Sequence, residues 1–85
     1  MALVAVFAFS TVAMAQTKWA YQSNYSEGMA CVKNDQGKYG YIDKTGKVVI
    51  PFQFEEAYSF EKSVAKVQDE NRVWRKIDKT GKYIE

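Results

Sequence analysis

The chain has 85 residues, with 12 Lys and Arg against 10 Asp and Glu, which gives a formal net charge of +2 at pH 7. So short a chain has room for one domain at most, and its nearly balanced charge creates no strong field for nucleic acid or an anionic membrane. Histidine is absent, and because it is the commonest general base and metal ligand, its absence argues against an enzyme.

The first fifteen residues form a distinct N-terminal segment. They carry no charge, Ala2 to Phe9 is an apolar run, and Ala13-Met14-Ala15 has the small-x-small pattern of a signal-peptidase site. The run is shorter than the roughly 20 apolar residues that a transmembrane anchor needs. No Lys or Arg precedes the run, and a start assigned a few residues late would explain this departure. We expect residues 1–15 to be a secretory signal-peptide helix and the mature chain to begin near Gln16.

A six-residue motif occurs twice in the rest of the chain. Ile42-Asp43-Lys44-Thr45-Gly46-Lys47 returns unchanged as Ile77 to Lys82, 35 positions later (77 minus 42). Residues 25–50 align over 60–85 without a gap, and their aromatic, apolar and turn positions coincide. An ungapped match over a whole unit indicates a tandem repeat. Residues 18–21 are a candidate remnant of a preceding copy.

Each copy has the pattern of short β-strands separated by turns. Residues 29–33 and 64–68 alternate apolar and polar side chains, a polar turn follows, and the next strand is expected over 38–43 or 73–78. Residues 48–50 form a third strand that Pro51 ends, because proline cannot donate to a ladder. The sequence therefore predicts an all-β protein of tandem antiparallel meanders, with about three strands per 35-residue unit.

The alternation also gives an expectation for the single cysteine, Cys31. Ala30 and Val32 face the core, so Cys31 falls on the other face, in register with Lys66 of the second copy. Two interpretations stay open: a partly buried small side chain, or an exposed thiol that forms an intermolecular disulfide after export.

The repeated motif is explained by turn geometry. We expect Asp43 and Asp78 to accept hydrogen bonds from backbone amides two and three residues on, and Gly46 and Gly81 to take the left-handed conformation. Asp-Lys-Thr-Gly also opens the phosphorylated loop of P-type cation pumps, but the membrane helices and nucleotide-binding parts of such pumps are missing. The lysines beside these structural turns remain free to meet a partner: Lys44, Lys47, Lys79 and Lys82.

These residues resemble the WG-repeat family, also called the KWG repeat. The family pattern is present as Tyr25-Ser26-Glu27-Gly28-Met29-Ala30-Cys31-Val32, then Gly37-Lys38-Tyr39-Gly40-Tyr41-Ile42-Asp43, a Gly-Lys turn and Val48-Val49-Ile50-Pro51. The second copy has Ser63 and Arg75 where the first has Gly28 and Gly40, which suggests a degenerate or truncated repeat. The resemblance implies a tandem β-repeat common in bacterial proteins. It brings no catalytic residues, cofactor or metal site.

The expected organisation has five parts. They are a signal peptide (1–15), an N-terminal segment of the mature chain (16–24), the first WG-like repeat (25–51), a connector (52–59) and the second repeat (60–85).

We expect a periplasmic or secreted, non-catalytic module that binds protein or serves as a scaffold. The alternatives are cell-wall or glycan binding through exposed aromatics, and a fragment of a longer array with no independent function. The expected partner is an unknown protein or cell-envelope component, with no nucleic acid, membrane contact only through the signal peptide, and possible homo-oligomers through edge strands. The candidate interaction surface comprises Tyr39, Tyr41 and Trp74 with the four turn lysines.

Overall fold

The computed structural model describes residues 19–85, so the predicted signal peptide lies outside the described residues. The described part is all β, and its seven strands form two antiparallel sheets, as the sequence predicts. The first sheet has the order β1-β2-β3-β4 and the second β5-β6-β7. The strands are β1 (Tyr21–Gln22), β2 (Met29–Lys33), β3 (Tyr39–Asp43), β4 (Val48–Phe54), β5 (Glu56–Ala57), β6 (Ala65–Gln68) and β7 (Trp74–Ile77).

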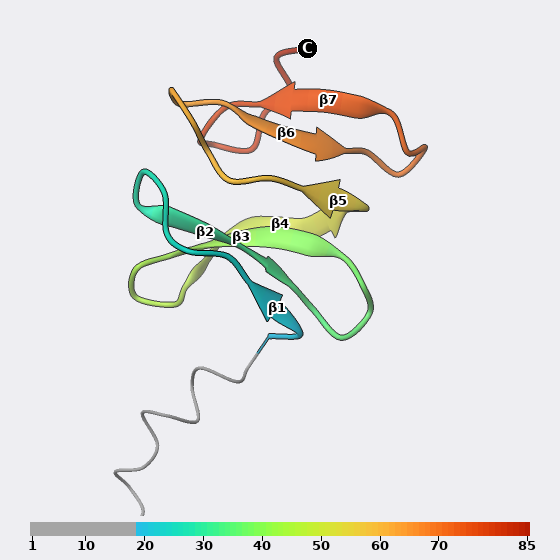
Figure 1. The fold of residues 1–85 in the computed structure, drawn as a ribbon. Helices are drawn as coiled ribbons and strands as arrows, with labels where there is room; N and C mark the ends of the chain where they lie inside the picture. The colour runs from blue at the N-terminus through green and yellow to red at the C-terminus, as the bar shows by residue number, and fades with distance from the viewer. Residues whose placement is uncertain (1–18) are drawn as a thin grey trace, which may run out of the picture.

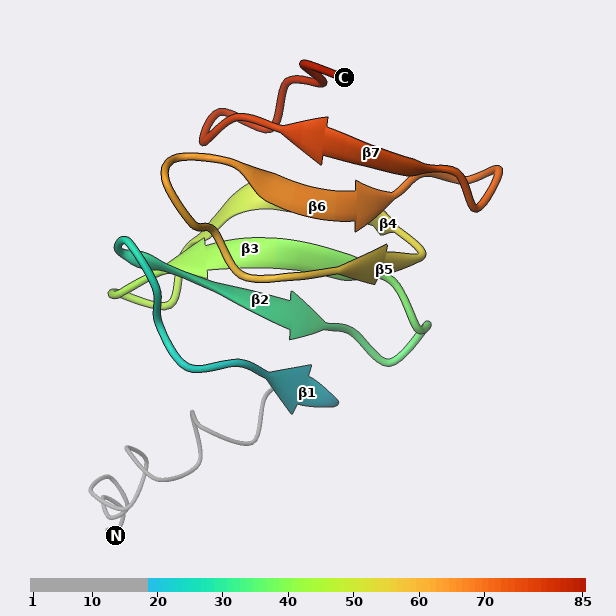
Figure 2. The ribbon, with the colours of Figure 1, turned by 45° about the horizontal axis from the view of Figure 1, so that its top comes forward.

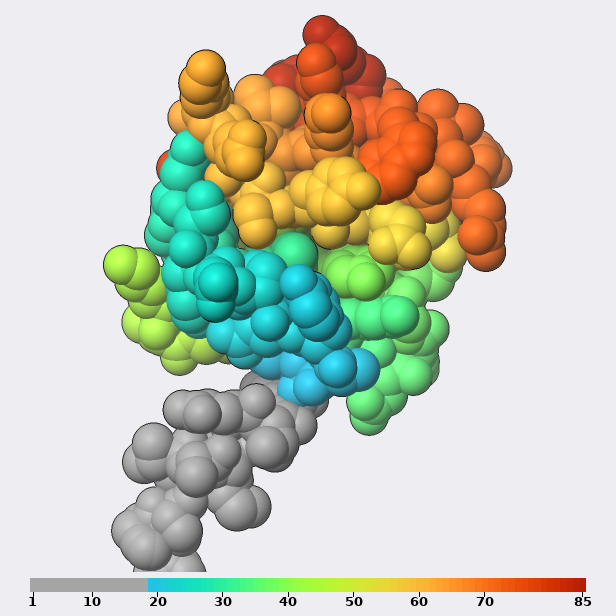
Figure 3. Space-filling view, viewed as in Figure 1, coloured from blue at the N-terminus to red at the C-terminus, as the bar shows by residue number. Residues whose placement is uncertain are grey.

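The two sheets lie one on the other as two layers. Figures 1 and 2 show the second sheet, in yellow-brown to red, above the first, and the space-filling view in Figure 3 shows the two layers in direct contact. Each sheet is a meander, because strands that follow one another along the chain lie side by side in antiparallel order.

Each copy of the repeat begins one strand earlier than the sequence suggested. β1 pairs with β2 through Tyr21 and Lys33. β5 pairs with β6 through Glu56 and Gln68, which are the equivalent residues 35 positions later. These two-residue strands lack a hydrophobic pattern of their own. They form because the neighbouring strand offers a row of unpaired backbone groups.

β4 does not end at Pro51, contrary to the sequence expectation, and runs on to Phe54. Tyr41 pairs with Ile50 and Tyr39 with Phe54, so four steps on β4 oppose two on β3 and the strand bulges around the proline. A bulge tolerates proline because its residues do not all donate to the ladder.

The bulge explains why a glycine occupies position 40. A Cβ added to Gly40 would lie 2.7 Å from the Ile50 carbonyl oxygen and 3.1 Å from the Phe52 nitrogen, both backbone atoms. Only a residue without a side chain allows the bulged strand to come this close. The second copy has Arg75 at this position and only a single bridge, from Ile77 to Tyr83, where β4 would lie.

The residues expected to connect the repeats are largely strand. Phe52 to Phe54 end β4, and after the single residue Glu55 the chain enters β5 of the second sheet. Lys38, at the start of the first sheet's β3 hairpin, forms an ion pair with Glu55 at this crossing. One continuous extended segment therefore passes from one sheet to the other.

A tight two-residue turn precedes β2 and recurs before β6. Ser26 and Met29 exchange both backbone hydrogen bonds, at 2.8 and 3.1 Å, and the central Glu27 and Gly28 have φ of 56° and 84°. Positive φ at both central positions defines a type I′ hairpin turn. In the second copy Lys62 and Ser63 adopt φ of 53° and 69° without a glycine, so this turn is strained.

Both faces of the first sheet are buried, which the alternation rule did not anticipate. Ala30, Val32 and Ile42 pack on one face with Trp19 and Phe52, whereas Cys31 and Tyr41 pack on the other face against the second sheet. Cys31 is 2% exposed, so its assignment to an outward face is wrong. Burial also raises the pKa of its thiol, which disfavours the reactive thiolate.

Tyr41 is at the centre of the contact between the sheets. It is fully buried, its ring centroid lies 4.9 Å from that of Phe60 at a steep angle, and its hydroxyl donates a 2.6 Å hydrogen bond to the Tyr58 carbonyl oxygen. Burial raises the pKa of Tyr41, so the hydroxyl remains a donor throughout the neutral range. Around it the core is completed by residues of both sheets, namely Met29, Ile50, Phe54, Ala57, Ala65, Val67 and Ile77.

Replacing Gly40 by alanine tests the close approach of β4. We expect Gly40→Ala to lower the free energy of unfolding by about 2 kcal/mol or more, since the new Cβ meets backbone atoms that cannot move aside. Arg75→Ala, at the equivalent position of the second copy, is the matched control and is expected to cost about 1 kcal/mol or less. Urea unfolding curves measure both, and equal losses would contradict the proposed role of the bulge.

Candidate functional site

The carboxylates of the two repeated turns are engaged within those turns. Asp43 Oδ1 accepts hydrogen bonds from the Thr45 hydroxyl at 2.6 Å and from the amides of Thr45 and Lys47 at 2.9 and 3.1 Å. The amides are two and four residues on, not two and three, because the Gly46 amide bonds to the Asp43 carbonyl oxygen. The threonine hydroxyl bond is the largest cause that lowers the pKa of Asp43.

The second turn repeats this geometry and has the same consequence. Asp78 accepts from the Thr80 hydroxyl at 2.6 Å and from the Thr80 and Lys82 amides, and its pKa is lowered chiefly by that hydroxyl. Gly46 and Gly81 have φ of 88° and 89°. In both turns the three hydrogen bonds go to Oδ1, so each carboxylate is held in place by its own turn.

The four turn lysines do not share one role. Lys44, Lys47 and Lys82 are exposed. Lys79 makes a 3.3 Å ion pair with the Glu27 carboxylate and also donates to the Glu27 carbonyl oxygen. Lys79 is therefore a contact between the copies of the repeat.

Glu27 connects the tight turn of the first copy to that of the second. Its carboxylate accepts from the amides of Lys62 and Ser63 at 2.6 and 2.9 Å, and the neighbouring Ser26 hydroxyl donates to the Phe60 carbonyl oxygen at 2.7 Å. The Ser63 amide is the largest cause that lowers the pKa of Glu27. The strained second turn is thus held by a carboxylate from the first.

The three aromatic candidates occupy different environments. Tyr41 is buried between the sheets, so its ring cannot meet a ligand without unfolding. Tyr39 is partly buried, with the Tyr21 ring at 6.3 Å and the Lys33 amine 5.6 Å from its ring centroid. Trp74 is 47% exposed. Of these three candidates, only Trp74 offers a large ring to solvent, and it does so on the second sheet's outer face, which is the face that points away from the first sheet.

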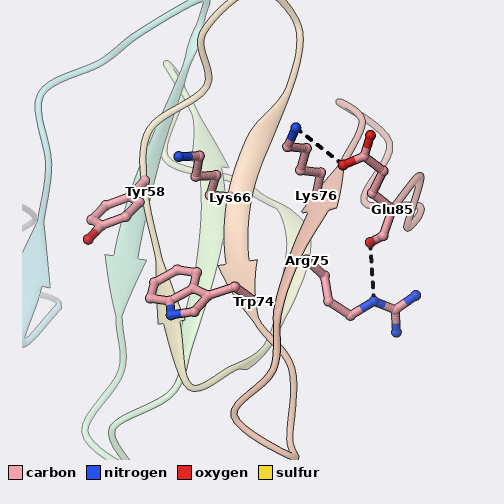
Figure 4. Close-up of a pocket in the computed structure, with 6 residues that line it drawn as sticks. All are labelled: Tyr58, Lys66, Trp74, Arg75, Lys76 and Glu85. Carbon is pink, nitrogen blue, oxygen red and sulfur yellow. Dashed lines mark hydrogen bonds and ion pairs between the residues drawn. The ribbon is translucent and has the colours of Figure 1, made fainter.

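Trp74 lies beside Tyr58 on this outer face. The two rings are nearly parallel, with centroids 5.4 Å apart and planes 10° from one another. Figure 4 shows both rings on the same side of β6 and β7, with Lys66 extending beside them. They line a hollow of about 410 Å³ together with Lys66, Arg75, Lys76 and Glu85.

A second hollow of about 400 Å³ adjoins the first and shares Tyr58, Lys66 and Lys76 with it. Ser59, Glu61 and Val64 complete its lining. We call the two hollows together the outer groove. It crosses the face of the second sheet, and its floor is the middle of β6 and β7.

The two lysines of the outer groove differ in whether they form an ion pair. Lys66 and Lys76 stand directly opposite one another on β6 and β7, a like-charge arrangement that is unfavourable. Lys76 is paired with Glu85 at 3.2 Å, whereas Lys66 has no ion pair among residues 19–85. The Arg75 side chain points to the opposite side, where its guanidinium lies 3.9 Å from the centroid of the Tyr83 ring (Figure 4).

Sequence reasoning did not select most of this groove. Tyr58 is one of several aromatics that the sequence offers, but it falls in the expected connector, and Lys66 marks only an outer face; neither belongs to the predicted interaction surface. The groove could have been found by comparing the two copies position by position, because Cys31 and Tyr41 of the first copy correspond to Lys66 and Lys76 of the second. The change from apolar to cationic side chains fits a face that is in contact with solvent and not with another sheet.

The segment from β3 to the turn after β6 matches a known repeat. The profile of the WG containing repeat matches residues 39–72, from the start of β3 to the turn after β6. The chain contains a WG repeat. Its family unit therefore begins in one sheet and ends in the next. No curated protein and no solved structure matched the chain.

Within residues 19–85, no three side chains among Cys, Asp and Glu gather as a group that could hold a metal ion. The same residues include no helix of the length and apolarity needed to cross a membrane.

The Glu27 contact predicts a specific dependence of stability on pH. A carboxylate whose pKa is lowered by folding stabilises the native state above its unfolded pKa, and this contribution is lost as the pH falls through the folded pKa. We expect Glu27→Gln to lower the urea midpoint at pH 7 and to approach the wild-type midpoint in acid, as the pH falls through the lowered pKa of Glu27 and the wild-type carboxylate becomes protonated.

Glu70→Gln is the control, because Glu70 is exposed and makes no ion pair within residues 19–85. Its midpoint should follow the wild type at both pH values. A gap between Glu27→Gln and wild type that persists unchanged at low pH would rule out the carboxylate as its cause.

Proposed function

We propose that this WG-repeat chain is an exported, non-catalytic binding module whose ligand occupies the outer groove. The observation that carries the proposal is the pair of exposed rings, Tyr58 at 59% and Trp74 at 47%, held parallel beside Lys66. Aromatic side chains with adjacent cations are the groups that contribute most at binding surfaces.

The location of the rings supports binding over packing. The first copy has Ser23 and Tyr39 at the positions of Tyr58 and Trp74, and there Tyr39 packs against the core between the sheets. In the second copy, Tyr58 replaces the small serine, and both Tyr58 and Trp74 are exposed. Large exposed rings lose hydrophobic stabilisation, so their presence indicates that they contact something other than water.

The chemistry of the groove supports a module without catalysis. The Asp43 and Asp78 carboxylates are held in turns, and the Cys31 thiol is buried with a raised pKa. The groove itself offers ammonium groups, rings and two glutamates, which are groups that hold a ligand in place. We place this ligand in the cell envelope or outside the cell, among proteins and envelope polymers.

A fluorescence titration tests the groove. In a Trp19→Phe background Trp74 is the only tryptophan, and its emission is followed while an acidic polysaccharide, a neutral polysaccharide and an acidic peptide are added in turn. We expect at least one to change the emission, and Tyr58→Ala to weaken that binding by about tenfold, since the stacked ring supplies contact area.

Tyr21→Ala, which removes an exposed ring from the first sheet, is the matched control and should leave the titration unchanged. If none of the three classes affects Trp74, or if Tyr58→Ala and Tyr21→Ala behave alike, the groove is not the binding surface.

Export is tested separately by the mass of the mature chain. We expect the full sequence, expressed with a C-terminal tag in a Gram-negative host, to be recovered from the periplasm starting at Gln16. Ala15→Lys should block processing, because signal peptidase requires a small residue before the cleaved bond. A cytoplasmic chain that retains residues 1–15 would contradict export.

A further inference from the structure

The two copies of the repeat use equivalent faces in opposite ways. In the first sheet, the face of Cys31 and Tyr41 is covered by the Ala65 and Val67 face of the second. The second sheet's equivalent of the Cys31 face carries Lys66 and Lys76 and is exposed. Another sheet stacked in the same manner would bury two ammonium groups, which is costly unless they are paired. The outer groove is therefore built for contact with solvent and ligand.

The lysine pair needs an anion to become favourable. Like charges directly opposite in adjacent strands repel one another, and only Lys76 has a carboxylate partner among residues 19–85. An anionic group placed near Lys66 would convert this repulsion into attraction, and the partly covered site would strengthen it relative to bulk water. The ligand is thus expected to carry spaced negative charges.

The stacked rings select for a flat, weakly polar surface next to those charges. Ring faces carry the negative side of an aromatic quadrupole, so they attract the polarised C–H groups of a sugar ring laid flat on them. Tyr58 and Trp74 hold one another at 10° between planes, so the indole needs no reorganisation to accept such a ring. An acidic sugar combines the C–H face and the carboxylate in one unit.

The position of the groove argues against an added peptide strand. A peptide that extends a sheet requires an open edge, whereas the groove lies on the face of β6 and β7, where β6 is the central strand. Two adjoining hollows that share Lys66 and Lys76 also suit a ligand with repeating units. Glu85 lines the first hollow and Glu61 the second, and their negative charges limit the attraction of the groove for a densely charged nucleic acid.

We infer that the outer groove binds a linear acidic polysaccharide, with one sugar ring stacked on Trp74 and its carboxylate at Lys66. The inference rests on the proposed binding role of the groove and specifies the class of ligand. Binding does not require any covalent step.

Calorimetric titration with oligogalacturonate, its methyl ester and poly-glutamate tests this class. The first two share the same sugar and differ only in the charge of the carboxylate, whereas poly-glutamate has the charge without a sugar ring. We expect oligogalacturonate to bind most tightly. Lys66→Gln should weaken it about fivefold, reduce its salt dependence and leave the methyl ester unaffected, because only the charged ligand pairs with the amine.

Trp74→Ala is expected to weaken both sugar ligands by about tenfold or more, and Lys33→Gln, which removes a lysine from β2 of the first sheet, should change neither. Circular dichroism confirms that each variant keeps its β spectrum. Single-stranded DNA is added as a further polyanion. If it or poly-glutamate binds as tightly as oligogalacturonate, with the same dependence on Trp74, the inference about sugars is overturned. The binding role of the groove then still stands. If no ligand depends on Trp74, both fail.

Discussion

The stacking of the first sheet on the second is the contact on which the rest of the molecule depends. Tyr41 donates to the Tyr58 carbonyl oxygen and packs against Phe60, while Cys31 fills the space beside Ala57. A chain with so few residues cannot bury enough apolar area within one sheet. Placing a second copy of the unit over the first supplies that area, and it turns an apolar face that would otherwise be exposed into core.

The stacked arrangement also explains why the two copies differ. The first contains the glycines that allow a relaxed type I′ turn at Gly28 and a close bulge at Gly40. The second copy has a strained turn at Lys62 and Ser63, which is supported by the Glu27 carboxylate of the first. Interactions between neighbouring units thus make up for local strain, as expected for repeat proteins whose stability is shared between units and their interfaces.

The candidate groove is a consequence of the same geometry. Because the second sheet covers the first, its own outer face is left without a covering sheet in the described residues, and the sequence there changes from Cys31 and Tyr41 to Lys66 and Lys76. Tyr58 reaches this face because the chain crosses from β4 to β5 next to the sheet contact, where its carbonyl oxygen accepts from Tyr41. The same residue therefore takes part in packing through its backbone and in the groove through its ring.

The sequence by itself determined the repeat, its 35-residue period, the all-β class and the antiparallel meander, because these follow from local periodicity and turn chemistry. It did not reveal β1 and β5, which exist only as partners of β2 and β6. Nor did it reveal that β4 continues through Pro51, because this depends on Gly40 of the neighbouring strand β3. Nor could alternation along one strand show that Cys31 and Tyr41 are buried, since burial of a second face requires another sheet above it. The contact between Tyr58 and Trp74 was likewise decided by tertiary structure. These residues lie sixteen positions apart in the chain (74 minus 58), and only the assembly of the second sheet brings their rings together.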